Sequence, residues 1–579
     1  MRRSKEGLLM RDGRYFLETF GCQMNILDSQ LVEGQLRARG LAPTDDYSSA
    51  DLILFNTCSV RQHAEDKVLS RLGQLKGLKR RRPETIVGVI GCMAEREKEG
   101  LFVKAPHVDL LCGPGELNKL SALIDEVRER HERVALLAGS LSRRTEVLQR
   151  ALEYDSLEAL DLSRAPELEA GVLQSYIRVQ RGCDQFCTFC VVPFTRGPER
   201  SRPPQHIVEE ARKLAERGCR EVTLLGQTVN SYVHQENGAP VRFAQLLERV
   251  HAVESLDRIR FVTSFPADWD EDIFRVMRDC PRIMPYLHIP AQSGSDRVLA
   301  AMKRGYTVAE YRRIIDRARE LVPRIAIAGD MIVGFCGETE GDFRQSVRLV
   351  REIEYAGLYV FKYSPRPGTK ADRNLADDVP DEVKAARCNE LLAVQAEIGA
   401  RQKRALVGSV ADVLVEGYSR FSRKALLGEG DAQLRTRGKA SAAMAAGAAA
   451  RRRATARPDG GGIDNALHAL HPAPVQESEQ DRGSEVLRSL AGARTGESTA
   501  QLVGRTPQDT IVVFDGTAKH IGAIARIEIQ RASANTLFGE IVEIVSPRRS
   551  AAEKTAAQAA NPSNGFVSLR VVGPSMVSG

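Results

Sequence analysis

The sequence lacks the two features that would take it into or across a membrane. No apolar run approaches the roughly 18 residues needed to span a bilayer. The amino-terminal segment MRRSKEGLLMRDGRYFLETF is charged, and it lacks the apolar stretch and the small-residue cleavage site of a signal peptide. We therefore expect a cytoplasmic protein that makes no use of a membrane.

The sequence also lacks a strong excess of one charge. The formal net charge is +7, which is compatible with binding a polyanion such as RNA but does not require it. Hydrophobic residues make up 42% of the chain and charged residues 27%, which is typical of globular proteins. A chain of 579 residues is too long for one core, and its length indicates three or four domains.

The sequence also lacks the even number of cysteines that a full set of disulfides would use. The chain has eleven cysteines. In a reducing compartment disulfides are rare, so clustered cysteines are better interpreted as metal ligands or catalytic groups.

Residues 14–130 alternate between strand-like and helix-like patterns. The apolar runs RYFLETFGC, ADLILFNTC and TIVGVIGC end in Cys22, Cys58 and Cys92, and each precedes a polar, helix-compatible stretch. This βα repeat predicts an α/β domain with a parallel sheet, whose strand ends meet at one edge where ligands bind. The wide spacing of the three cysteines does not by itself define a site, and three buried structural cysteines are the alternative.

A polar, helix-prone linker is expected over 141–169, and a second α/β domain over 170–403. Strand candidates recur at SYIRVQRGC, EVTLLG, RIRFVTS, YLHIPA, IAIAGDMIVGF and YVFKYSP, with helical patterns between them. About six βα units at this spacing predict a barrel or a partial barrel.

Residues 404–546 are β-rich and predict a small all-β barrel of about five strands. An insertion at about 428–497, rich in alanine, glycine and arginine, interrupts this module, and we expect it and the tail 547–579 to be disordered. We also expect the flanking strands, ADVLVEG and TIVVFDG, to pair as though the insertion were absent.

The sharpest chemical signal is the spacing of Cys183, Cys187 and Cys190. Three thiolates within eight residues can wrap one [4Fe–4S] cluster and leave its fourth iron open to a small molecule. A zinc site with a remote fourth ligand is the alternative, although structural zinc prefers paired cysteines and four protein ligands. Phe186 and Phe189 lie within this loop, and their apolar bulk would shield a cluster from water.

The segment RVQRGCDQFCTFCVVPFTRGPERSR resembles radical S-adenosylmethionine (SAM) enzymes, and more narrowly the methylthiotransferase family. The segments LLGQTVNSY, LHIPAQSGSDRVLAAMKRGYT and FKYSPRPGTKA extend the resemblance over nearly the whole chain except the insertion and the tail. It implies an N-terminal methylthiotransferase domain, a central partial (β/α) radical SAM barrel and a C-terminal RNA-binding TRAM barrel.

The resemblance also implies two [4Fe–4S] clusters and the site residues. The catalytic cluster lies on Cys183, Cys187 and Cys190, and an auxiliary cluster lies on Cys22, Cys58 and Cys92. The residues expected to contact SAM are Gly226, Gln227, Ser264, Gly334, Gly337 and Glu338. Residues expected at the barrel mouth, which could equally be satisfied polar groups at strand ends, are Pro266, His288, Gln292, Ser293 and Ser295. The other cysteines, expected to be ordinary buried thiols, are Cys112, Cys219, Cys280, Cys336 and Cys388.

The activity that the resemblance implies is methylthiolation of C2 of N6-isopentenyladenosine at position 37 of tRNA. One SAM gives a 5′-deoxyadenosyl radical, which activates a C–H bond that acid–base catalysis cannot, and a second SAM is the methyl donor. The expected partners are a tRNA anticodon stem-loop and an electron donor such as flavodoxin or ferredoxin, and the chain is expected to be a monomer. Candidate phosphate contacts are Arg420, Arg423, Lys424 and Arg505.

Three other interpretations remain open at this stage. The substrate could be N6-threonylcarbamoyladenosine of other tRNAs, or ribosomal protein S12. The chain could also be a non-catalytic RNA-binding protein with a structural metal.

Overall fold

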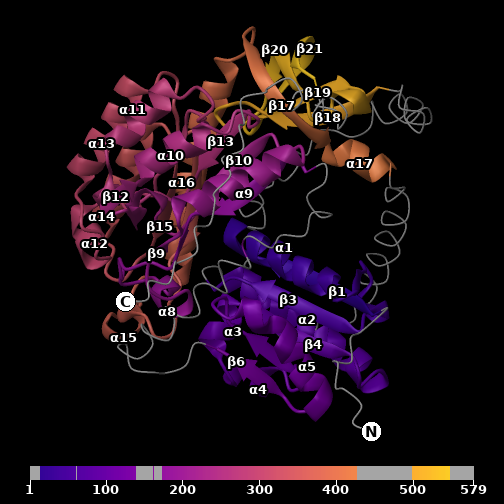
Figure 1. The fold of residues 1–579 in the computed structure, drawn as a ribbon. Helices are drawn as coiled ribbons and strands as arrows, with labels where there is room; N and C mark the ends of the chain where they lie inside the picture. The colour runs from indigo at the N-terminus through magenta and orange to yellow at the C-terminus, as the bar shows by residue number, and fades with distance from the viewer. Residues whose placement is uncertain (1–12, 60–61, 138–160, 162–171, 427–498, 548–579) are drawn as a thin grey trace, which may run out of the picture.

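The computed structural model describes residues 13–59, 62–137, 161, 172–426 and 499–547, and these form three units (Figure 1). The expected linker, insertion and tail lie outside the described residues, apart from Asp161, and their predicted order or disorder stays a prediction. Among the described helices, none is long and apolar enough to cross a membrane.

The N-terminal unit is a parallel sheet in the order β2-β1-β3-β4-β5-β6. Every residue of β3 and β4 is buried, as expected for central strands covered on both faces by helices. The strands are β1 (Arg14–Phe20), β2 (Ala42–Pro43), β3 (Leu52–Thr57), β4 (Ile86–Gly91), β5 (Leu110–Cys112) and β6 (Val134–Leu136). The helices are α1 (Gln23–Ala38), α2 (Gln62–Arg81), α3 (Cys92–Glu97), α4 (Gly100–Lys104) and α5 (Leu120–Arg130).

The central unit is an open barrel of parallel strands made from two three-stranded sheets, β7-β10-β13 and β14-β15-β16. A bridge between Ile259 and Ile283 joins the two sheets. The strands are β7 (Gln174–Arg178), β10 (Glu221–Leu225), β13 (Arg258–Phe261), β14 (Tyr286–His288), β15 (Ala326–Val333) and β16 (Gly357–Lys362). Two antiparallel pairs lie outside these sheets, β8 (Gln180–Arg181) with β9 (Arg200–Ser201) and β11 (Val233–Glu236) with β12 (Ala239–Arg242).

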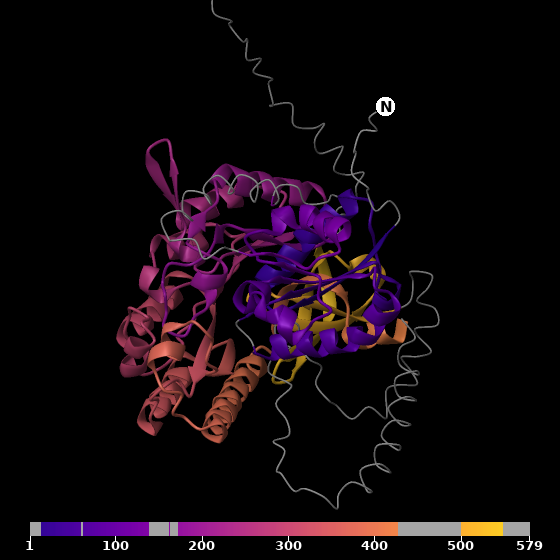
Figure 2. The same ribbon diagram turned by 90° about the horizontal axis from the view of Figure 1, so that it is seen from below.

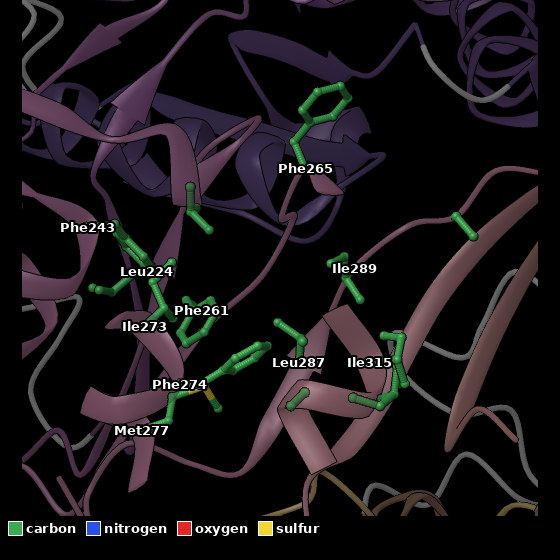
Figure 3. Packing of buried hydrophobic residues seen from close by; sticks show 14 of the residues in the cluster. Leu224, Phe243, Phe261, Phe265, Ile273, Phe274, Met277, Leu287, Ile289 and Ile315 are labelled. Atoms are coloured by element: carbon green, nitrogen blue, oxygen red, sulfur yellow. The ribbon is translucent and has the colours of Figure 1, made fainter. Parts of the chain in front are cut away.

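Helices cover the outside of this barrel, and their apolar faces form the largest core of the chain. Figure 3 shows part of that core, where Leu224 and Phe261 of two neighbouring strands face Phe243, Ile273 and Phe274 of the helices outside. The helices are α8 (Val192–Thr195), α9 (Pro204–Glu216), α10 (Phe243–His251), α11 (Asp272–Asp279), α12 (Asp296–Ala301), α13 (Val308–Leu321), α14 (Glu340–Ile353), α15 (Lys370–Asn374) and α16 (Asp381–Arg404).

The C-terminal unit is a closed barrel in the order β17-β18-β19-β21-β20. The predicted small five-stranded module is therefore confirmed. The expected direct pairing of ADVLVEG with TIVVFDG is wrong, because β18 forms a hairpin with β19 and lies between β19 and β17. The elements are β17 (Val410–Tyr418), α17 (Arg420–Leu426), β18 (Ala500–Arg505), β19 (Ile511–Gly516), β20 (Ile524–Ala532) and β21 (Thr536–Ser546).

In Figure 1 the central unit fills the left of the view, and on the right the N-terminal sheet (indigo) lies below the C-terminal barrel (yellow); Figure 2 shows the arrangement from below. Two buried arginines of β13 fix the contact between the central unit and the C-terminal barrel. Arg258 donates to the carbonyl oxygens of Arg505 and Asp412, and Arg260 donates to those of Thr506 and Pro507. The C-terminal barrel therefore closes the end of the central barrel at which its strands begin.

Candidate active site

Three cysteines follow the carboxyl ends of three neighbouring strands in the N-terminal sheet. Cys22 follows β1, Cys58 follows β3, and Cys92 is the first residue of α3 after β4. The register places Phe20 beside Thr57, and Thr57 beside Gly91, so the three cysteines meet at one sheet edge as predicted. We refer to Cys22, Cys58 and Cys92 as the edge triad.

Two buried asparagines hold this edge in place. Cys22 Sγ lies 3.1 Å from Asn25 Oδ1, and Asn25 Nδ2 donates to Asn56 Oδ1 at 2.9 Å. Asn56 Nδ2 in turn donates to the carbonyl oxygen of Asn25 at 2.8 Å. Gly21 admits the close approach of the strands, because a Cβ there would lie 2.5 Å from Cys58 Cβ. The asparagines escaped sequence analysis, although each lies within three residues of a triad cysteine.

The electrostatics of the edge triad favour anionic sulfur at one position. A hydrogen bond with Cys58 is the largest influence on the pKa of Cys22; together with the cation of Arg196 it outweighs the effect of burial and lowers this pKa to about 6. Burial raises the pKa of Cys92, and Arg196 opposes that rise. Arg196 Nη2 also pairs with the buried Asp28 at 2.9 Å. Since cluster ligands must be thiolates, this cation assists metal binding at the edge triad.

The second set of cysteines lies on the loop between β8 and β9. A hydrogen bond from Cys183 N to the Gly197 carbonyl closes the base of this loop, and Thr188 N donates to the Met302 carbonyl at 3.0 Å. Burial raises the pKa of Cys183 to about 11 and that of Cys190 to about 12. Loading a cluster would therefore release protons from these thiols. We refer to Cys183, Cys187 and Cys190 as the loop triad.

One cavity of about 600 Å³ joins the two triads. All six cysteines line it, together with side chains from the central strands. The N-terminal and central units approach each other here, since α3, which begins at Cys92, packs against α8, which follows Cys190. The C-terminal barrel contributes Glu416, Arg505 and Asp509 to the lining.

The predicted SAM contacts fall into two groups. Gly226, Gln227 and Ser264 line the cavity, and Gln227 Oε1 and Ser264 Oγ are buried without a hydrogen-bond partner in the described structure. Orphaned buried polar atoms of this kind fit a polar ligand such as SAM. Gly334, Gly337 and Glu338 are not among the lining residues. Glu338 Oε1 accepts from Gly334 N and from Arg387 Nη1, each at 2.8 Å, so it supports its own loop.

Some of the residues expected at the barrel mouth line the cavity, and others do not. His288 and Gln292 line the cavity, and His288 Nε2 lies 3.3 Å from Asp330 Oδ1. Ser295 instead caps α12 and donates to Asp342 at 2.6 Å. Pro266, Ser293 and Ser295 are not among the lining residues, so for these three the structure favours a local structural role.

Two arginines that sequence analysis missed contact the cysteines. Arg196 lines the cavity and lies beside the edge triad. Arg304 lines the same cavity, and its Nη1 donates to Cys187 Sγ at 3.3 Å. Arg196 lies close enough to Cys190 to have been noticed, but Arg304 is separated from Cys187 by 117 residues, and only the fold brings them together.

The predicted phosphate contacts are partly corrected. Arg420 and Arg423 are exposed on α17, as RNA contact requires. Arg505 is wrong as a phosphate contact, because it turns toward the cavity and pairs with Glu416 at 3.2 Å and Asp509 at 3.0 Å. Lys424 belongs to α17, but its side chain lies outside the described part of the chain.

The cysteine geometry favours a cluster over a single zinc ion. All eleven cysteines, each within the described residues, are free of disulfides. Among the described residues, no three His, Cys, Asp or Glu side chains converge closely enough to hold one metal ion. A cubane separates its thiolates more widely than one tetrahedral zinc does, so two triads of buried or half-buried thiols fit the larger group.

Family models divide the chain in the same way as the structure. Residues 14–113 match the uncharacterized protein family UPF0004, residues 177–350 the radical SAM superfamily, and residues 493–542 the TRAM domain. Together with the open parallel barrel and the loop triad, these matches define a radical SAM enzyme with a TRAM domain. The expected three-part fold class is thereby confirmed.

Curated relatives narrow the class to one family. A tRNA-2-methylthio-N(6)-dimethylallyladenosine synthase of Rhodopirellula baltica is 41% identical over 92% of this chain and 96% of its own length. The synthase of Protochlamydia amoebophila is 43% identical over 70% of this chain and 85% of its own length. The chain belongs to the family of tRNA-2-methylthio-N(6)-dimethylallyladenosine synthases.

Among solved structures, the radical SAM methyltransferase TsrM of Kitasatospora setae, with cobalamin and a [4Fe-4S] cluster bound, is 14% identical with a TM-score of 0.45. The match covers 62% of this chain and 74% of that chain.

Proposed function

We propose that this chain methylthiolates C2 of N6-isopentenyladenosine at position 37 of tRNA, using two [4Fe–4S] clusters and SAM. The observation that carries the proposal is the single cavity lined by six cysteines from two domains. A reaction that joins sulfur to a carbon activated by a radical needs both functions next to one base, and this cavity supplies that arrangement. The activity for which the curated relatives are named supports the same substrate.

The cysteines and the polar lining residues have separate tasks. When bound, the cluster on the loop triad supplies the electron that cleaves SAM, and the cluster on the edge triad supplies the sulfur that is transferred. Gln227 and Ser264 offer unpartnered oxygen atoms that orient SAM beside the loop triad. Phe189 lines the cavity and packs against Phe335, which keeps water away from the loop triad.

The RNA substrate is expected to reach the cavity from the side of the C-terminal barrel. Exposed Arg420 and Arg423 on α17 provide phosphate contacts, which position RNA without reading its sequence. An unpaired loop base can be splayed out of its stack and enter a cavity of this size. We place the reaction in the cytoplasm, with a monomeric enzyme and a low-potential electron donor such as flavodoxin or ferredoxin.

The alternative substrates are not favoured. The curated relatives are named for dimethylallyladenosine of tRNA, rather than for threonylcarbamoyladenosine or ribosomal protein S12. A non-catalytic RNA-binding protein has no use for unpartnered polar atoms beside two cysteine triads.

Nucleoside analysis of tRNA tests the proposal directly. A bacterial strain lacking its own synthase is complemented with this chain, and its total tRNA nucleosides are measured by mass spectrometry. The 2-methylthio-N6-isopentenyl nucleoside should reappear while the unmethylthiolated precursor falls. Reappearance of only the threonylcarbamoyl derivative, or modification of protein S12 alone, would contradict the proposed substrate.

A further inference from the structure

Arg304 is a buried cation whose charge is not balanced by a carboxylate. Its residue exposure is 6%, and in the part of the chain that the structure describes no Asp or Glu pairs with it. An isolated buried charge is costly unless an opposite charge lies nearby. The partner within reach is the sulfur of Cys187, 3.3 Å from Nη1, which would carry negative charge as a cluster ligand.

The guanidinium is held rigidly in this position. Nε donates to Tyr306 Oη at 3.1 Å, and Nη2 donates to the Pro290 carbonyl at 3.4 Å. The rings of Phe265 and Tyr306 lie 4.5 and 5.4 Å from the guanidinium carbon. Tyr306 is itself fixed, since its hydroxyl donates to the Ala291 carbonyl at 2.8 Å. A planar cation that is stacked and hydrogen-bonded on several sides cannot swing away when the charge of its partner changes.

The consequence concerns the reduction of the loop-triad cluster, so the inference rests on the proposed function. One-electron reduction adds one negative charge to the cluster and its thiolates. A fixed cation and an N–H donor to a ligand sulfur stabilise the more negative state and so raise the reduction potential. We propose that Arg304 is the residue that tunes the loop-triad cluster, making it reducible by a low-potential one-electron donor before SAM is cleaved.

The test compares reduction potentials in full-length protein in which only the loop triad can hold a cluster. The host carries Cys22→Ala, Cys58→Ala and Cys92→Ala, is reconstituted anaerobically and is titrated without SAM, with the reduced cluster followed by EPR. Arg304→Met should lower the ratio of reduced to oxidised cluster at a fixed poise about tenfold, which for one electron equals about 59 mV. Arg304→Lys, which retains the charge, should recover most of this loss.

Lys303→Met provides the matched control. It removes the same charge one residue earlier, at an exposed position where solvent screens it, so the potential should not change. If Arg304→Met fails to retain iron, Arg304→Gln replaces it and must show the same shift.

Three results would overturn the proposal. The first is an unchanged potential in iron-loaded Arg304→Met or Arg304→Gln. The second is a shift in Arg304→Lys as large as that in Arg304→Met, since charge would then not be the cause. The third is weakened SAM binding with an unchanged SAM-free potential, which would assign Arg304 to the SAM carboxylate. A host that takes up no reducible cluster would instead refute the loop-triad assignment itself, and the inference with it.

Discussion

The two cysteine triads both face an arginine, but the two arginines differ in how their charge is used. Arg304 meets Cys187 with no carboxylate partner among the described residues. Arg196, beside the edge triad, pairs with Asp28, and Asp28 also accepts from Arg178 at 2.7 Å. The charge of Arg304 therefore acts on Cys187 without a competing carboxylate in the described part of the chain, whereas that of Arg196 is shared between Asp28 and the edge triad.

The difference indicates two separate roles. Asp28 lies on α1 of the N-terminal unit, while Arg178 and Arg196 belong to the central unit. Asp161 extends the network by pairing with Arg178 and Arg181. The network beside the edge triad thus fixes two domains against each other, and the single cation beside the loop triad acts on electron transfer.

The largest expected effect separates the triads by function. Anaerobically reconstituted protein should carry about eight irons, and replacing all three loop-triad cysteines by alanine should leave about half. Cys58→Ala should abolish methylthio product but still cleave SAM reductively to 5′-deoxyadenosine. Iron analysis and chromatography of both products provide the measurement.

Cys112→Ala is the control for this pair, because Cys112 is a buried cysteine of the same sheet outside the triad. It should retain full iron content and both activities. Normal methylthio product from Cys58→Ala would refute the role of the edge triad in sulfur delivery.

A second change would leave Arg196, like Arg304, without a carboxylate partner among the described residues. Asp28→Asn removes the carboxylate shared by Arg178 and Arg196, and a buried ion pair broken on one side typically costs about 3–5 kcal/mol. We expect the thermal midpoint of unfolding to fall by several degrees. Asp279→Asn, which breaks an exposed pair with Arg278, should leave the midpoint unchanged. Equal midpoints for the two variants would show that the network does not hold the domains together.

A smaller effect concerns Glu199, an acid beside Thr228 in the loop after β10, which pairs with no arginine in the described structure. Burial raises its pKa to about 7, although Thr228 Oγ1 donates to it. The folded state then binds more protons than the unfolded state between about pH 4.3 and pH 7, so stability falls as pH rises through this window. Glu199→Gln removes this cost.

Thermal midpoints at two pH values test this expectation. The free energy of unfolding of Glu199→Gln should equal that of the parent protein at pH 4. At pH 8 it should be larger by about 1 kcal/mol, a figure reduced for partial solvent exposure. Glu209→Gln on α9, where the side chain is 44% exposed, should show no such gain. A gain from Glu199→Gln that is independent of pH would contradict the raised pKa.

The smallest effect is expected from deleting residues 430–495. The described residues on either side of this segment lie close together, because Tyr418 pairs with Leu502 and Ser422 Oγ accepts from Gln501 N at 3.1 Å. A short connection can therefore replace the segment, and closure entropy changes only with the logarithm of its length. Iron content and nucleoside product should remain within about twofold of the parent, with at most a modest loss of tRNA affinity at low salt. Loss of activity in cluster-loaded deletion protein would reveal a specific function.

Local patterns predicted how the six cysteines of the two triads are grouped in the fold. The loop triad is visible in eight consecutive residues, and the edge triad follows from strand ends that a parallel sheet must align. The Arg196–Asp28 pair, 168 residues apart, could not be predicted because it depends on how two domains pack.

Two errors have the same physical origin. The strand pattern around the insertion identified strands but not their partners, so β18 was overlooked as the neighbour of β17. Arg505 was taken as a surface cation because charge alone does not distinguish solvent from a domain interface. Both failures concern contacts between segments, which composition does not encode.

The C-terminal barrel supplies part of the wall of the reaction chamber through Glu416, Arg505 and Asp509. Another RNA-binding barrel therefore cannot replace it without changing the cavity. Consider a chimera that received the corresponding barrel from another RNA-modifying enzyme. It would retain RNA affinity, but its cavity would lack part of the wall. Transplanting these three side chains and the loop 506–509 with the barrel would restore that wall.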